Sequence, residues 1–199
     1  MVAHSALTGA NLHEPKGVAS ATVGTVYKAD GAGSGSWTTI DNNSVPTGFP
    51  VQVVATNYTT FLNLSTTIPY DDTVPQNTEG TEIMTVSITP KSTTNKLLVR
   101  AVIQCGSVNA AVVLGALFQD STASALAAAA CGFDGTDNES MATMVIEHWM
   151  TAGTTSSTTF KVRVGEETGT SGYINGANGA RKFGGVSTCT LTVTEYKAS

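Results

Sequence analysis

The sequence predicts an all-β protein, with an antiparallel β-sandwich head preceded by an extended N-terminal arm. Three observations carry this prediction. Charged residues make up 13% of the 199 residues, about half the roughly 25% of ordinary soluble domains. The many β-branched side chains favour strands over helices. From residue 50 onward, short apolar runs alternate with polar turns at the spacing of a sandwich rather than of βαβ units.

Residues 1–49 are predicted to form an extended arm and linker, and residues 50–199 the head. The arm shows almost no strand or helix period, and it ends in two runs of turn formers, 30–36 and 41–46. Its large apolar side chains are too few to offset roughly 1–2 kcal/mol of backbone entropy per ordered residue. We therefore expect the arm to be ordered only where it lies on another surface.

The head is predicted to contain a series of short strands. Apolar side chains alternate cleanly with polar ones in 82–89 and 188–194, which indicates strands with one buried face. The run 96–105 alternates less and indicates a central strand covered on both faces, as at a subunit contact. The predicted strands are 51–56, 60–64, 82–89, 96–106, 112–119, 141–150, 158–164, 172–174 and 187–196.

The alanine-rich run 124–130 leaves two alternatives open. Alanine is the best helix former, but this run is too short for even a marginal helix and is bounded by Ser-Thr and Cys-Gly. The same small side chains suit a strand that packs closely on its neighbour. We favour a strand or an extended loop over a helix.

Charge, hydropathy and cysteine usage exclude several classes of partner. The net charge is −5 and the ten Lys and Arg residues are scattered, so we expect no nucleic-acid binding. No cationic start precedes an apolar run and no stretch of eighteen apolar residues occurs, so we expect neither a signal peptide nor membrane insertion. Cys105, Cys131 and Cys189 are widely spaced and odd in number, so we expect reduced, mostly buried thiols.

The residue pattern predicts no catalytic, metal or cofactor site. The histidines are not paired and accompany no nucleophile motif, and His148 is expected on one strand face with Ile146 and Met150. The acidic runs 71–72 and 134–139 are interpreted as turns rather than as catalytic or calcium-binding carboxylates. The dispersed aromatic residues are expected mostly in the core. We therefore predict that the protein is not an enzyme.

Two parts of the chain resemble bacteriophage proteins. Segments 7–17 and 24–37 resemble the start of phage head-fibre and virion-decoration proteins. Segments 68–76 and 150–155 look like the compact trimeric jelly-roll heads of phage fibres, which are similar to tumour-necrosis-factor and complement heads. The resemblance implies a homotrimer in which three jelly-roll sandwiches pack around an axis.

The resemblance also implies a function. It indicates a structural capsid decoration or head-fibre protein, located on the virion, assembled in the host cytoplasm and attached to the phage major capsid protein through its arm. Three weakly binding arms would then hold tightly once the heads join them. The residues expected to bind the capsid are Leu7, Leu12, His13, Pro15, Lys16, Gly17, Tyr27 and Trp37.

Two other functions are weighed against this one. The first is a tail or collar receptor-binding protein that recognises a host-surface glycan through loops such as 134–139 and 165–178. In that alternative Tyr70 and Tyr173, near expected loop ends, are possible sugar contacts. The second is a glycan-cleaving enzyme, which needs a carboxylate cleft that the sequence does not support.

Overall fold

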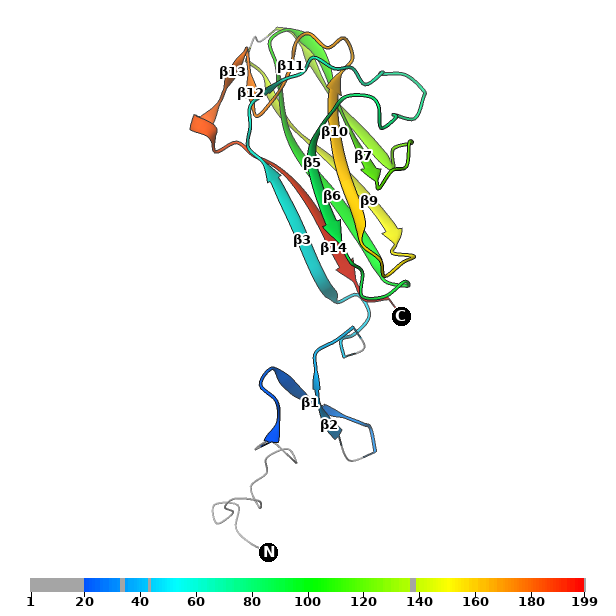
Figure 1. Ribbon diagram of the computed structural model, residues 1–199. Coiled ribbons are helices and arrows are strands. Elements are labelled where there is room, and N and C mark those ends of the chain that lie inside the picture. Colours follow the sequence, from blue (N-terminus) through cyan, green and yellow to red (C-terminus); the bar gives the residue numbers. More distant parts are fainter. Residues whose placement is uncertain (1–19, 33–34, 43, 137–138, 199) are drawn as a thin grey trace, which may run out of the picture. The chain divides into compact units, whose positions relative to one another are not determined.

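The computed structural model describes residues 20–32, 35–42, 44–136 and 139–198 (Figure 1). The chain divides into two compact units, Met1–Pro46 and Thr47–Ser199. This division lies close to the predicted boundary between residues 49 and 50. Within the described ranges, no helix is long and apolar enough to cross a membrane.

The described part of the first unit contains an antiparallel hairpin of β1 (Thr25–Ala29) and β2 (Gly35–Thr39). Tyr27 and Trp37 lie opposite each other, and their rings meet edge to face with 5.5 Å between centroids. Cross-strand aromatic pairs of this kind stabilise short sheets. No strand is predicted here from the sequence, because such short runs within a polar, glycine-rich segment show no clear alternation.

The second unit is built from two antiparallel sheets that face each other (Figure 1). The first sheet contains, in spatial order, β3 (Pro50–Tyr58), β14 (Cys189–Tyr196), β6 (Lys96–Ser107) and β9 (Met141–Thr151). The second contains β5 (Thr81–Ile88), β10 (Thr158–Glu166), β7 (Ala110–Gln119) and β8 (Ala127–Asp134). Shorter elements complete the unit. Strand β11 (Gly172–Ile174) pairs with β6 and with β4 (Leu62–Asn63). Strand β12 (Gly176–Ala177) pairs with β13 (Ala180–Arg181), and the 3-10 helix η4 (Phe183–Gly185) follows β13 in the chain.

The strand order is that of a jelly roll. Numbered along the chain, the long strands of the second unit follow the order 1-8-3-6 in the first sheet and 2-7-4-5 in the second. Nearly every connection therefore crosses between the sheets, and the first and last long strands, β3 and β14, pair with each other. The prediction of an all-β antiparallel sandwich is confirmed.

Each predicted run overlaps an observed strand, and the alanine-rich run leads into β8. From Ala127 to Asp134 this segment pairs with β7, which gives hydrogen-bond partners to the backbone groups on that side of the strand. Its small inward side chains, such as Ala127 and Ala129, pack on the core. Strand pairing and close packing thus override the helix propensity of alanine.

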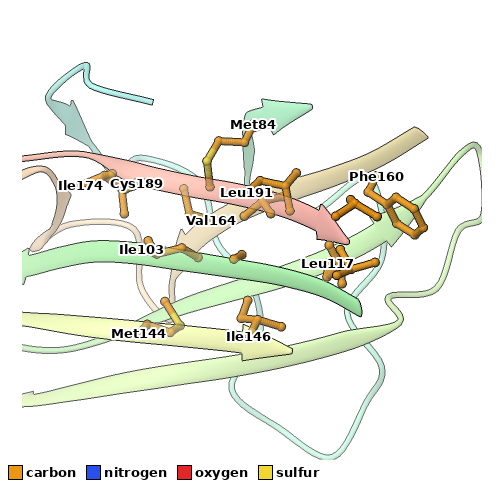
Figure 2. Close-up of a cluster of buried hydrophobic side chains, with 14 of the residues drawn as sticks. Met84, Ile103, Leu117, Met144, Ile146, Phe160, Val164, Ile174, Cys189 and Leu191 are labelled. Carbon is orange, nitrogen blue, oxygen red and sulfur yellow. The ribbon is translucent and has the colours of Figure 1, made fainter. Parts of the chain in front are cut away.

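The core lies between the two sheets. Figure 2 shows Ile103 and Leu191 of the first sheet near Leu117 and Phe160 of the second, within one cluster of buried side chains. The central strand β6 contributes its entire inward row, which is fully buried: Leu97, Val99, Ala101, Ile103 and Cys105. Burying one large apolar side chain contributes roughly 1.5–3 kcal/mol, so this row is a main source of stability.

A buried polar network holds the C-terminal end of the chain. Glu195 is fully buried, and its Oε1 accepts hydrogen bonds from the Lys91 backbone N–H and from Asn95 Nδ2, both at 2.7 Å. Asn95 Oδ1 in turn accepts the Ala198 backbone N–H at 3.1 Å. Each of these bonds gives a buried polar group a partner within the protein. The network ties the end of β14 to the turn between β5 and β6.

The run 71–72 and the described start of the run 134–139 lie in turns, as predicted. Asp71 Oδ1 accepts hydrogen bonds from the backbone N–H and the hydroxyl of Thr73. Asp134 Oδ1 accepts the same pair of bonds from Thr136, at 3.0 and 2.8 Å. These bonds favour the ionised carboxylates and lower the pKa of both groups. Both aspartates therefore cap their own turns.

At Gly106 the backbones of neighbouring segments approach closely, so we expect a side chain at this position to destabilise the fold. A methyl group at Gly106 would overlap the carbonyl oxygen of Gly176 and lie 2.9 Å from that of Ser140. Because backbone must move to admit it, Gly106→Ala is expected to lower the free energy of unfolding by about 1–3 kcal/mol. Urea denaturation measures this change. Gly132→Ala is the matched control, since nothing lies within 4 Å of the added methyl; equal losses in both variants would contradict the assigned packing.

The aspartate turns predict that loss of a threonine hydroxyl changes the pKa of Asp71 and that of Asp134 by unequal amounts. The Thr73 hydroxyl is the first cause of the lowered pKa of Asp71, whereas the Thr136 backbone N–H is the first cause at Asp134. Thr73→Val should therefore raise the pKa of Asp71 toward its ordinary value more than Thr136→Val raises that of Asp134. Carboxyl ¹³C NMR titration measures both. Because both pKa values are depressed on folding, their stabilising contribution is present above the unfolded pKa and is lost as pH falls through the folded pKa. Equal upward shifts would argue against these turns.

Candidate interaction surface

The outer faces of the two sheets differ in what covers them. On the second sheet, the connection between β4 and β5 lays Ile68 against Leu114, Ala116 and Phe118. Ile68 is fully buried there, and Phe118 is 1% exposed. The outward side of β7 is therefore closed by the chain itself.

Large apolar side chains are exposed on the outer face of the first sheet. Val53 is 59% exposed, Val145 42% and Trp149 57%. The register places Val53, Thr194, Leu98 and Trp149 in one row across β3, β14, β6 and β9. Directly paired residues share a face, so this row forms a continuous apolar band across the sheet.

One further apolar row lies along the strands, separated from the first by a charged row. This row joins Thr190, Val102 and Val145. Between it and the first row, Arg100 Nε lies 3.2 Å from Glu147 Oε1, with both side chains about half exposed. Exposed pairs of this kind contribute about 1 kcal/mol or less. The central charges thus neutralise each other within a face of small and apolar side chains.

The band ends in a hollow of about 470 Å³. Trp149 and Tyr196 line it, with ring centroids 5.3 Å apart and ring planes inclined by 34°. Lys96 and Lys197 also line it, and Lys96 Nζ donates to Thr151 Oγ1 at 2.6 Å. The whole outer face, from Val145 to this hollow, is called the sheet-one face below.

Glu166 is the other fully buried carboxylate among the described residues, and its oxygens accept backbone and hydroxyl hydrogen bonds. It is 1% exposed. Its Oε1 accepts the Thr168 hydroxyl at 2.9 Å, and its Oε2 accepts the backbone N–H groups of Thr170 and Ser171. Both oxygens are used to close the turn after β10. In the described part of the chain, no group of three or more His, Cys, Asp or Glu could hold a metal ion.

The residues singled out from the sequence do not form one site. Leu7, Leu12, His13, Pro15, Lys16 and Gly17 lie outside the described residues, whereas Tyr27 and Trp37 pair within the hairpin. Tyr70 is 62% exposed. Tyr173 is only 9% exposed and stacks on Phe61 with 5.8 Å between centroids. The loop-end exposure assumed for Tyr173 was wrong, because β11 inserts it between β6 and β4.

Sequence reasoning missed the residues of the sheet-one face. Trp149 was assigned to the core with the other aromatics, but alternation along β9 turns it outward, while Ile146, His148 and Met150 turn inward as predicted. The signal was present in the sequence: β9 carries large apolar side chains on both faces, including Val145. Doubly apolar strands indicate that something covers both sides.

Comparison with known proteins identifies the domain. The family model of the Pgp3 C-terminal domain matches residues 68–199. This family is named for a chlamydial virulence protein. No curated protein matches the chain.

The match overturns the resemblance to phage proteins. The assignments to a capsid decoration protein, to a phage tail or collar receptor-binding protein and to the virion surface were wrong, because the matching family is not a phage head-fibre family. The capsid-binding roles expected for the arm residues depended on those assignments and lose their basis. Segments 7–17 and 24–37, which carried the resemblance to the attachment segment, lie outside the matched region, whereas segments 68–76 and 150–155 lie inside it. A shared jelly roll does not imply a shared function. The match covers about two thirds of the chain, which therefore belongs to the Pgp3 C-terminal domain family.

Proposed function

We propose that this chain is a non-catalytic protein whose jelly-roll unit associates as a homotrimer through the sheet-one face. The observation that carries the proposal is the contrast between the two outer faces. The chain covers the outer face of the second sheet with Ile68 but leaves Val53, Val145 and Trp149 exposed on the first. Large exposed apolar patches mark sites of association.

The composition of the face favours burial against protein. Removing apolar surface from water contributes about 25 cal/mol per Å², and an exposed Trp such as Trp149 is the side chain most enriched in interaction hot spots. Thr190, Thr192 and Thr194 stand between the apolar residues and are only half-buried. Their short side chains allow a neighbouring surface to approach closely.

Self-association explains the charge pattern of the face better than a charged partner does. The central Arg100–Glu147 pair leaves no net charge in the middle of the apolar rows. Face-to-edge contacts between identical copies close into rings when the rotation permits. The family supports three copies, because the Pgp3 C-terminal domain has a tumour-necrosis-factor-like, trimeric architecture.

The acidic groups and thiols support a structural rather than a catalytic role. Asp71 and Asp134 cap turns, and both oxygens of Glu166 accept backbone or hydroxyl hydrogen bonds. Burial raises the pKa of the Cys189 thiol to about 11, so this thiol is protonated near neutral pH. A trimer would instead act by presenting three copies of its first unit, which multiplies weak binding.

The oligomeric state tests the proposal. Sedimentation at micromolar concentration should give three times the chain mass for the full-length protein. The double variant Val53→Lys with Trp149→Lys should sediment as a monomer, because charges would be buried at the contact. Ser87→Lys, on an exposed position of β5, is the matched control and should remain trimeric. Circular dichroism should show unchanged strand content in both variants.

Two results would contradict this proposal. A wild-type chain that sediments as a monomer at these concentrations would remove the trimer. A folded double variant that stays trimeric would show that the contact lies elsewhere on the unit.

A further inference from the structure

The hollow at the end of the sheet-one face combines an aromatic pair with two lysines. Trp149 and Tyr196 form its apolar wall, and Lys96 and Lys197 stand beside them. The Lys96 ammonium donates to a threonine hydroxyl and the Lys197 ammonium to a backbone carbonyl. Among the described residues, no carboxylate lies within ion-pair distance of either lysine. This sheet-one hollow therefore suits a segment that is both aromatic and acidic.

An exposed segment on the second sheet has the complementary composition. Tyr70 is 62% exposed, and Asp71 and Asp72, which follow it, are exposed as well. In the part of the chain that the structure describes, no Lys, Arg or His lies within ion-pair distance of either aspartate. Residues 69–75, called the Tyr70 loop below, thus present an aromatic ring and two negative charges without a positive partner.

The Tyr70 loop is held in place at both ends. Ile68, which precedes it, is fully buried against β7. The Pro75 carbonyl, at its other end, accepts the Ala125 backbone N–H at 2.9 Å. Between these points, the Asp71 carboxylate accepts its two hydrogen bonds from Thr73. A segment fixed in this way loses little conformational entropy when it binds.

The loop cannot fill the hollow of its own chain. It lies on the outer side of the second sheet, beside the first residues of β8, whereas the hollow lies on the outer face of the first sheet. Both lie toward one end of the sandwich, because β6 and β8 begin there and β7, β9 and β14 end there. Copies related by a rotation axis along the strands stay at one level. The loop of one copy can therefore meet the hollow of another.

We propose that the Tyr70 loop of one copy fills the sheet-one hollow of the next copy in the trimer. Tyr70 packs there against the Trp149–Tyr196 pair, and Asp71 and Asp72 lie beside the two lysines. The contact rests on the trimer of the proposed function and names the segment that the sheet-one face receives. Each copy gives one loop and receives one, so three equal contacts close the ring.

Zero-length cross-linking of the full-length protein tests the contact. A carbodiimide joins a carboxylate to a lysine amine only where the two groups touch. The protein is refolded from an equal mixture of ¹⁴N- and ¹⁵N-labelled chains before the reagent is added. Mass spectrometry should then find Asp71 or Asp72 linked to Lys96 or Lys197, in peptide pairs that combine one ¹⁴N and one ¹⁵N member. Such mixed pairs form only between chains.

A charge-reversal cycle measures what the contact contributes. Asp72→Lys and Lys197→Glu should each raise the dissociation constant of the trimer by roughly tenfold or more, because like charges would then face each other. Combined in one chain, the two changes should restore most of the affinity. Sedimentation equilibrium over a dilution series measures all three constants.

Glu167→Lys is the matched control for Asp72→Lys. It makes the same change of net charge at an exposed position, beside the other end of β8. The dissociation constant of this variant should equal that of the wild type. Asp72 is chosen over Asp71 for the reversal because Asp71 caps its own turn.

Two outcomes would overturn the inference while leaving the trimer intact. One is a set of mixed-label links that join other segments and never the Tyr70 loop to the hollow. The other is a double variant, Asp72→Lys with Lys197→Glu, that dissociates as readily as the weaker single variant. A wild type that sediments as a monomer would instead contradict the trimer itself, and the loop contact with it.

Discussion

The structure depends on the pairing of β6 along both of its edges. Strand β9 pairs with one edge from Lys96 to Gly106, and β14 and then β11 pair with the other. This double pairing turns a complete row of side chains, from Leu97 to Cys105, onto the facing sheet, where every member is fully buried. One strand, β6, therefore contributes a central row of the hydrophobic core, and the neighbouring strands hold that row in place.

The same alternation that buries one side of β6 leaves the other side in need of cover. On the second sheet the chain supplies that cover with Ile68, which sits on β7. On the first sheet, the described residues leave Leu98, Val102 and their neighbours beside exposed Val53 and Trp149. A sandwich with one covered and one exposed apolar face is better suited to an oligomer than to a monomer. The open face also explains why β6 showed weak alternation in the sequence.

Polar groups inside this unit serve the architecture. Glu195 and Asn95 join the C-terminal end to the turn before β6, and Glu166 closes the turn after β10. Their hydrogen-bonded oxygens stabilise turns between strands that lie far apart in the sequence, where backbone groups would otherwise lack partners. The jelly roll thus keeps its crossing connections in place with a few buried carboxylates and amides, and its thiols gather where β6, β8 and β14 meet the core.

The sequence by itself determined the long strands of the second unit and the turn at Asp71, because both arise from neighbouring residues. Alternation in 82–89 and 188–194 and the Asp and Pro residues around Asp71 are local signals, and the structure confirms them. Local resemblance in 7–17 and 24–37 misled the functional assignment, because it lay outside the region that identifies the family. Only the tertiary structure decided that Trp149 faces solvent and that Tyr173 is buried. Those facts depend on which distant strands pair and on what covers each face, and no periodicity along one strand encodes them.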